Sequence, residues 1–370
     1  MIVIWFEIAY NEVVQNDHLK GVIKMKKREI ALSLLLIFVL ALTACTTGPQ
    51  TSTGGLKIAM VTDEGGVNDQ SFNQSAWEGL QQAKKDLGVH VSYQESKQEA
   101  DYVPHMETLL EAKNDLIWGV GYKLADAVMG AATANPDTKY GIVDHDYGDK
   151  TPSNVVCVVF QAEQPSFLVG YIAGRMTQTN QLGFVGGIEG DVIWGFDYGY
   201  QAGAQYAAKE LGKEITVLSQ YADSFGDSAK GKAIATTMYQ KGIDVVFHAA
   251  GGVGDGVIEA ANEQKKWVIG VDRDQSYLAP EYVLTSAMKR VDVGIYNVVK
   301  DLKDGKFEGG GTVSYGLADG GAVDIAPTSD KHVPADILKD VENLKKDIID
   351  GKIVVPYNAE TYKTFMDSLK

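Results

Sequence analysis

Residues 56–87 read LKIAMVTDEGGVNDQSFNQSAWEGLQQAKKDL, and this stretch decides the fold class. It opens with an apolar run of strand length, residues 56–62, which a polar loop with two glycines follows. From Ser71 to Leu87 apolar residues recur every three or four positions, which predicts a helix with one buried face. Gly88 comes directly afterwards, as is typical beyond the last turn of a helix. The stretch therefore predicts the first unit of an alternating β/α fold.

The same alternation continues along the chain. Further strands are predicted at Val89–Tyr93, Leu116–Val120, Tyr140–Asp144, Val155–Phe160, Leu182–Gly186, Ile215–Leu218, Val245–His248, Trp267–Val271 and Val283–Ala287. Helical patterns separate most of them, at Val103–Ala112, Leu124–Ala134, Ser166–Met176, Phe196–Leu211, Ala229–Lys241 and Val257–Gln264. This order predicts an α/β protein with doubly wound parallel sheets. Because about ten strands would make one sheet unusually wide, we expect two sheets in two lobes.

Composition narrows the classes of function. The chain has 370 residues, with 34 Lys+Arg against 49 Asp+Glu, and a net charge of −15. This acidity without a basic block argues against nucleic acid as a partner. Two cysteines exclude a disulfide scaffold, and six scattered histidines argue against a histidine metal site, so we expect neither a metal nor a cofactor.

The N-terminal region matches a bacterial export signal. Met25-Lys26-Lys27-Arg28 is basic, residues 30–42 are apolar, and Leu42-Thr43-Ala44-Cys45 has the order of a lipobox. We therefore predict a lipoprotein signal peptide over 25–44, lipidation of Cys45, and a flexible tether over 45–55 that is rich in Thr, Ser and Gly. An ordinary signal peptide or an anchor helix is the alternative. Residues 1–24 match no targeting pattern, and we expect Met25 to be the true start.

Polar and aromatic residues gather where the predicted strands end. In parallel α/β sheets, ligands bind beyond the carboxyl ends of the strands. The residues that follow these ends and offer carboxylates, amides, rings, a close backbone or a cation are Asp63, Asn68, Phe72, Asp144, Trp194, Phe196, Gly252, Asp272 and Lys289. They predict a binding site for a small molecule at this edge.

Catalytic motifs are not found among them. Gly251–Gly256 lacks the Lys-Ser/Thr ending of a P-loop and predicts a tight turn that lets the backbone approach a ligand. The chain contains neither a Gly-x-Ser-x-Gly elbow nor a His-Glu-x-x-His pair. Asp144-His145-Asp146 lacks the ligand spacing of an EF-hand and predicts a solvated turn instead. These observations favour a binding protein over an enzyme.

Three separated blocks resemble one known family. They are residues 66–73 (GVNDQSFN), residues 270–275 (GVDRDQ) and residues 285–289 (TSAMK), and residues 184–187 with 196–203 match a further block. Together with the lipobox, they resemble the basic membrane protein (BMP) family, whose members are substrate-binding lipoproteins of ABC transporters similar to the purine nucleoside receptor.

The resemblance implies a type I periplasmic-binding-protein-like fold, in which three crossings join two lobes. The N-terminal lobe would comprise residues 56–162 and 290–318, and the C-terminal lobe residues 163–289 and 319–370. The Gly-rich segment 309–321 would carry the third crossing, ahead of a helix near 336–350.

The resemblance also implies roles for the site residues. Phe72 and Phe196 would sandwich a base, with Trp194 as the alternative to Phe196. Asp63, Asn68 and Asp144 would bind the edge of the base. Asp272 would accept the ribose hydroxyls and pair with Lys289, and Asp274 could exchange roles with Asp272.

The function implied is a lipid-anchored, extracytoplasmic, monomeric receptor that carries nucleosides, expected to be purine nucleosides, to an ABC permease and its ATPase. A nucleoside is neutral, and the predicted edge has few cations, so we expect nucleosides to bind better than nucleotides. A lipid-anchored regulatory or signalling protein of the same family is the alternative. A nucleoside hydrolase is disfavoured, because the edge lacks a dense aspartate cluster for calcium.

Overall fold

The computed structural model describes residues 55–369. The expected start at Met25, the predicted signal peptide over 25–44, the predicted lipidation at Cys45 and residues 45–54 of the predicted tether lie outside the described residues. Within them, no helix combines the length and the apolar character that crossing a membrane requires.

The first lobe contains a six-stranded sheet in the order β11-β5-β4-β3-β1-β2. All neighbouring strands in it run parallel. The strands are β1 (Lys57–Thr62), β2 (His90–Gln94), β3 (Leu116–Val120), β4 (Lys139–Val143), β5 (Val155–Phe160) and β11 (Gly311–Tyr315). The predicted β1 unit thus lies inside the sheet, between β3 and β2.

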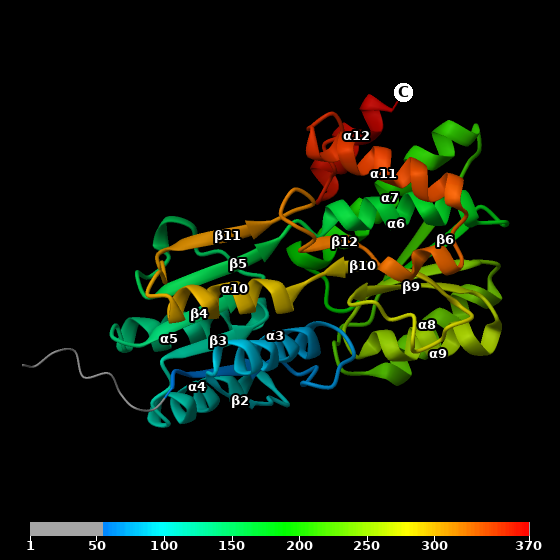
Figure 1. Ribbon diagram of the computed structural model, residues 1–370. Coiled ribbons are helices and arrows are strands. Elements are labelled where there is room, and N and C mark those ends of the chain that lie inside the picture. Colours follow the sequence, from blue (N-terminus) through cyan, green and yellow to red (C-terminus); the bar gives the residue numbers. More distant parts are fainter. Residues whose placement is uncertain (1–54, 370) are drawn as a thin grey trace, which may run out of the picture. The chain divides into compact units, whose positions relative to one another are not determined.

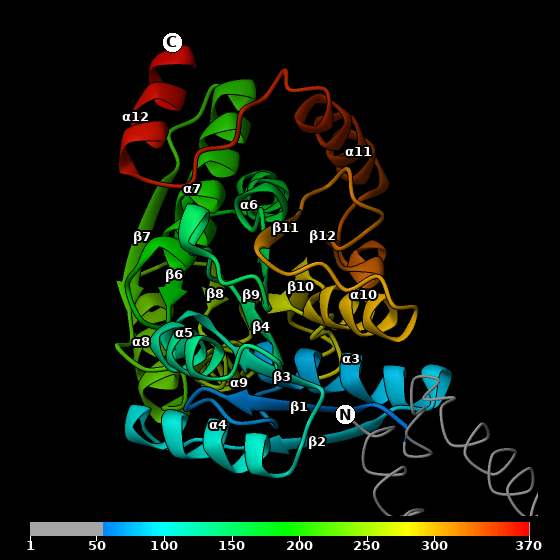
Figure 2. The same cartoon turned by 90° about the vertical axis from the view of Figure 1, so that its left-hand side faces the viewer.

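Helices cover both faces of this sheet. Ile58 and Met60 of β1 pack on the face that α3 (Phe72–Leu87) and α10 (Val291–Lys303) cover. Ala59 and Val61 pack on the other face, under α4 (Tyr102–Glu111) and α5 (Ala125–Ala134). Alternation along one strand therefore fills two cores, as a sheet buried on both faces requires. Figures 1 and 2 show α3 and α10 side by side.

The second lobe repeats this plan. Its six-stranded sheet has the order β12-β10-β9-β8-β6-β7, in which only β12 runs antiparallel to its neighbour. The strands are β6 (Gln181–Gly186), β7 (Thr216–Tyr221), β8 (Val245–Ala249), β9 (Trp267–Asp272), β10 (Val283–Lys289) and β12 (Val323–Ile325). The predicted α/β architecture with two lobes is confirmed.

The helices of the second lobe again form two layers. One core contains α6 (Glu163–Met176), α7 (Asp191–Leu211), α11 (Ala335–Ile349) and α12 (Ala359–Ser368). The other contains α8 (Ser228–Gln240) and α9 (Val253–Gln264). Helices α6 and α7 approach so closely that a Cβ at Gly203 would overlap the carbonyl of Phe167.

Three connections run between the lobes, from β5 to α6, from β10 to α10 and from β11 to β12 (Figure 1). Hydrogen bonds join the third connection to each of the other two, and the N–H of Arg290 in the second donates to the carbonyl of Ala322 in the third at 2.7 Å. The N–H of Gln161 donates to the carbonyl of Tyr315 at 2.8 Å, and the N–H of Leu317 donates to Gln164 Oε1 at 2.8 Å. The expectation of three crossings is therefore confirmed.

Two helices begin a full turn or more earlier than predicted. Helix α7 starts at Asp191 instead of Phe196, and α9 starts at Val253 instead of Val257. In α9 the glycines permit close packing, because a Cβ at Gly254 would overlap the His248 ring and one at Gly256 the carbonyl of Ser228. Among the glycines from 251 to 256, only Gly251 has the left-handed conformation of a tight turn, with φ +55°. The amphipathic helix α10 and the short helix α12 are additions to the predicted elements.

Candidate functional site

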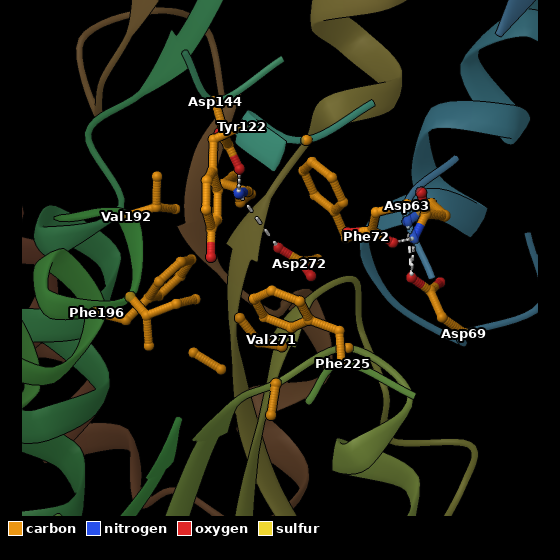
Figure 3. Close-up of a pocket in the computed structure, with 17 residues that line it drawn as sticks. Asp63, Asp69, Phe72, Tyr122, Asp144, Val192, Phe196, Phe225, Val271 and Asp272 are labelled. Carbon is orange, nitrogen blue, oxygen red and sulfur yellow. Dashed lines mark hydrogen bonds and ion pairs between the residues drawn. The ribbon is translucent and has the colours of Figure 1, made fainter. Parts of the chain in front are cut away.

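A pocket lies where the carboxyl ends of the two sheets face each other (Figure 3). It includes about 490 Å³ of empty space, counted together with its open mouth. Strand ends, the first turn of α3 and the start of α7 supply its walls. The lining residues are Asp63, Asp69, Phe72, Asn73, Gly121, Tyr122, Asp144, Val192, Ile193, Phe196, Phe225, Ala249, Ala250, Gly251, Val271, Asp272 and Lys289.

Two phenylalanines enter the pocket from opposite lobes. Phe72 is the first residue of α3, and Phe196 lies in the second turn of α7. Figure 3 shows them on opposite sides of the space. Trp194 is not among the lining residues; its indole N–H donates to Glu189 at 3.3 Å. Of the two aromatic candidates on α7, the structure brings Phe196 to the pocket.

Lys289, at the end of β10, lies at the centre of the polar contacts. Its Nζ is 2.5 Å from Asp144 Oδ2 of the first lobe and 4.0 Å from Asp272 Oδ1 of its own lobe. The same ammonium lies 4.5 Å from the ring centroid of Phe72 and 5.4 Å from that of Phe196. All three charged side chains are buried, so each charge depends on the others for compensation. The expected partner Asp272 is thus the more distant one, and Asp144 makes the direct contact.

Asp144 and Asp272 both have an unusual backbone conformation. Asp144 has φ +62° and Asp272 has φ +63°, in the left-handed region where Asp is among the better tolerated residues. At Asp272 the N–H of Arg273 donates to the carbonyl of Val271 at 2.6 Å, which forms a tight turn around the aspartate. Such conformations persist where the surrounding structure holds them, and they cluster at functional sites.

Burial makes Asp272 harder to ionise than an ordinary aspartate. Desolvation raises the pKa of its carboxyl to about 6, although Lys289 and the Ser71 hydroxyl both favour the charged form. The Ser71 hydroxyl donates to Asp272 across the two lobes. Asp272 therefore offers a buried acceptor whose partners come from both lobes.

Asp63 and Asp69 form the opposite end of the pocket together with Asn73. The side-chain amide of Asn73 donates to Asp63 Oδ1 at 2.8 Å and to Asp69 Oδ2 at 3.0 Å. Asp69 also accepts the N–H groups of Asn73 and Gln74, at 2.8 and 3.0 Å, and so caps α3. Desolvation raises the pKa of Asp63 to about 7, so this carboxyl exchanges a proton near neutral pH.

Apart from Trp194, the alternative to Phe196, eight ligand-binding residues were predicted; the structure brings six of them to the pocket and leaves two outside it. Asn68 is exposed, and its neighbour Asp69 lines the pocket instead. Gly252 is the residue before α9, and its neighbour Gly251 lines the pocket. Asp274, considered as a substitute for Asp272, accepts hydrogen bonds from Thr328 at 2.8 and 2.9 Å and lies outside the lining set.

Tyr122 and Phe225 line the pocket but were missed in the sequence. Tyr122 follows β3 and Phe225 follows β7, so both obey the rule that located the other residues. Their rings meet edge to face across the two lobes, with centroids 6.4 Å apart. Reading the residues after the predicted strand Leu116–Val120 would have found Tyr122. Phe225 was harder to find, because β7 ends at Tyr221, beyond the predicted strand end at Leu218.

Further contacts join the lobes beside the pocket. The Arg273 guanidinium lies 2.7 Å from Glu78, and the Tyr277 hydroxyl donates to Gln70 Oε1 at 2.6 Å. The side-chain amide of Gln275 donates to the carbonyl of Gln70 at 3.0 Å. Arg273 is therefore paired with Glu78 at the lobe boundary. Lys123, another nearby cation, is paired with Glu64 and Glu99, at 2.7 and 2.9 Å.

The charges of the pocket restrict what it can accept. Four carboxyl groups line it, and Lys289 is the single basic residue among its lining residues. A phosphate group bound here would face these carboxyl groups, and the one cation in the lining, Lys289, is already paired with Asp144. In the part of the chain that the structure describes, no group of three or more His, Cys, Asp and Glu is placed to hold a metal ion.

Comparison with known proteins places this geometry in a family. Residues 56–359 match the model of the Bmp family, described as ABC transporter substrate-binding protein PnrA-like. The chain belongs to this PnrA-like family. The resemblance found in the sequence is thereby confirmed.

Several known proteins resemble the chain over most of its length. The "ABC transporter nucleoside-binding protein BmpA" of Lactococcus lactis is 42% identical, over 90% of this chain and 99% of that protein. "Basic membrane protein A" of Borreliella afzelii is 39% identical, over 87% of this chain and 98% of its own. A solved ABC transporter solute-binding protein from Aeropyrum pernix has a TM-score of 0.75 at 28% identity, and the match covers 85% of this chain and 97% of that one.

Proposed function

We propose that this PnrA-like protein is a lipid-anchored receptor of an ABC importer, which binds nucleosides, purine nucleosides foremost, between its lobes and presents them to the permease. The observation that carries the proposal is the pair Phe72 and Phe196 facing a pocket with four carboxyls and one paired cation. A nucleoside has two flat apolar faces, several hydroxyl donors and no charge. The 42% identity to a nucleoside-binding protein supports the same ligand class.

Each part of the ligand has a matching group. The rings of Phe72 and Phe196 would stack on the base, and each such stack is worth about 1–3 kcal/mol in single-stranded nucleic-acid complexes. Asp63, with a pKa of about 7, would bind the base edge, because its carboxyl can accept or donate a hydrogen bond near neutral pH. Asp272 would accept ribose hydroxyls, and Lys289 would hold that carboxylate and contribute a donor.

Binding and release would be the whole mechanism. The pocket draws walls from both lobes, so a ligand that contacts both favours the closed arrangement by its difference in affinity for the two states. Ser71 with Asp272, and Lys289 with Asp144, already connect the lobes at the pocket. The proposal assigns no catalytic step to any of these residues. Cys45, when lipidated, would keep the receptor at the outer face of the cell membrane.

One pair of variants tests the proposal. Asp272→Asn removes the proposed ribose acceptor, and we expect a loss of at least tenfold in nucleoside affinity by isothermal titration calorimetry. Asp274→Asn is the matched control, since Asp274 lies two residues away, bonds to Thr328 and does not line the pocket. Mass spectrometry of the small molecule that co-purifies with the wild-type protein identifies the natural ligand. Unchanged affinity in Asp272→Asn, or a co-purifying solute of another class, would contradict the proposal.

A further inference from the structure

Tyr122 occupies a central place in the pocket wall. It follows β3, which lies between β1 and β4 in the sheet, and the residues after those two strands are Asp63 and Asp144. The turn before it favours glycine, because Gly121 has φ +111°, and the backbone there passes close to Asp63 and the Phe72 ring, which a Cβ would contact at 3.4 and 3.5 Å. Figure 3 shows the Tyr122 side chain reaching into the pocket.

The hydroxyl of Tyr122 has no partner among the described residues, although its oxygen is buried. Some tyrosines are hydrogen-bonded, such as Tyr221, whose hydroxyl donates to Asp197 at 2.8 Å, and Tyr147, whose hydroxyl donates to the carbonyl of Ala125 at 2.6 Å. The buried hydroxyls of Tyr102, Tyr140 and Tyr200 also have no partner among the described residues, but only Tyr122 of these four lines the pocket. Desolvation raises the pKa of Tyr122 to about 12, so the group keeps its proton at neutral pH. A buried O–H without an acceptor is unfavourable, and a group aimed into a binding pocket can find its acceptor on the ligand.

We infer that Tyr122 is a specificity-determining residue whose hydroxyl donates a hydrogen bond to an acceptor on the bound ligand, either a ring nitrogen of the base or an oxygen of the sugar. The inference rests on the proposed nucleoside function and adds a contact to it. Phe225 holds the ring from the other lobe, edge to face at an interplanar angle of 77°. The hydroxyl is therefore positioned by residues from both lobes.

This contact would discriminate among ligands. A ligand without the matching acceptor leaves the O–H buried and unpaired, which penalises that ligand more than the loss of an average hydrogen bond. Replacing Tyr122 by Phe removes both the bond and the penalty. The variant should bind the full ligand more weakly and the ligand without the acceptor at least as well as the wild type does.

The experiment compares three proteins with a series of ligands. Tyr122→Phe keeps the aromatic ring against Phe225. Tyr140→Phe is the matched control, because the Tyr140 hydroxyl is also buried without a partner, but lies in the core under α5 and away from the pocket. Calorimetry measures each protein with adenosine and with analogues in which one ring nitrogen or one sugar hydroxyl has been removed.

We expect Tyr122→Phe to lose about three- to tenfold in affinity for adenosine, the usual range for one hydrogen bond. The loss should vanish for one analogue, and whether this analogue lacks a ring nitrogen or a sugar oxygen identifies the acceptor. Tyr140→Phe should match the wild type throughout. Equal affinities of Tyr122→Phe and the wild type, or an equal loss with every analogue, would overturn the inference. If the wild type binds none of these nucleosides, the proposed function fails and this inference fails with it.

Discussion

Replacing Lys289 by Met leaves two buried carboxyl groups without the cation that compensates them. In the wild type, Nζ of Lys289 lies 2.5 Å from Asp144 and 4.0 Å from Asp272, and the side chains are 3%, 8% and 6% exposed. Methionine fills a similar volume, so the change removes charge more than packing. Breaking a buried pair by removing one partner destabilises a protein by about 3–5 kcal/mol, and we expect a loss of that size at pH 8.

The loss should depend on pH. Lys289 lowers the pKa of Asp272, which burial has already raised to about 6. Without the lysine this pKa rises further, so Asp272 becomes neutral at mildly acidic pH and its burial costs less. A raised pKa in the folded state means that stability is lost as the pH rises through that pKa. The difference in stability between the wild type and Lys289→Met should therefore be smaller at pH 5.5 than at pH 8.

Urea unfolding at both pH values measures the free energy of unfolding of each protein. The double variant Lys289→Met, Asp144→Asn should recover part of the loss, because it removes one of the stranded charges, and the coupling should exceed about 1 kcal/mol. Lys300→Met is the matched control, since Lys300 forms an exposed pair with Asp304 at 2.9 Å, and it should leave the unfolding midpoint unchanged. A loss below about 1 kcal/mol at pH 8, or the same loss at both pH values, would refute the reasoning.

Three further predictions concern the ring pair, the base edge and the anchor. Phe72→Leu and Phe196→Leu should each weaken nucleoside binding by about 1–3 kcal/mol in calorimetry, and an unchanged Kd would remove that ring from the stack. The pKa of Asp63 is raised from its ordinary value of 3.8 to about 7, so the free energy of unfolding should fall by on the order of 4 kcal/mol as the pH rises through this window. In urea unfolding, Asp63→Asn should lack this pH-dependent fall. An equal dependence of stability on pH in the wild type and the variant would argue against a buried carboxyl there. Cys45→Ala should move the protein from the detergent phase to the aqueous phase in Triton X-114 partitioning, and retention in the detergent phase would exclude the lipid anchor.

Strand ends could be predicted well from the sequence, and with them most of the pocket. Asp63, Asp144, Asp272 and Lys289 each lie at or directly beyond the end of an apolar run, so each is expected at the carboxyl edge of its own parallel sheet. Local pattern does not say which residue of a loop turns inward. Asn68 and Asp69 are adjacent polar residues, and the capping bonds that Asp69 makes with α3 turn it toward the pocket while Asn68 is exposed.

Pairings across the lobes could not be predicted from local pattern. Asp144 and Lys289 are far apart in the sequence and become partners only because the two sheets face each other. The role of the glycines near Gly252 could not be predicted from local pattern either. Their spacing fits a turn, but Gly254 and Gly256 belong to α9, where the space available to a Cβ is set by His248 and Ser228 on other elements.

The central claim is that an acidic pocket with a single, already paired cation selects a neutral nucleoside. Calorimetry of the purified wild-type protein with adenosine, guanosine and their 5′-monophosphates tests it most directly. The account predicts that each nucleoside binds at least tenfold more tightly than its monophosphate, because the phosphate would meet the carboxyl groups of Asp63, Asp69, Asp144 and Asp272 with no free cation in the wall. Tighter binding of a monophosphate would contradict it.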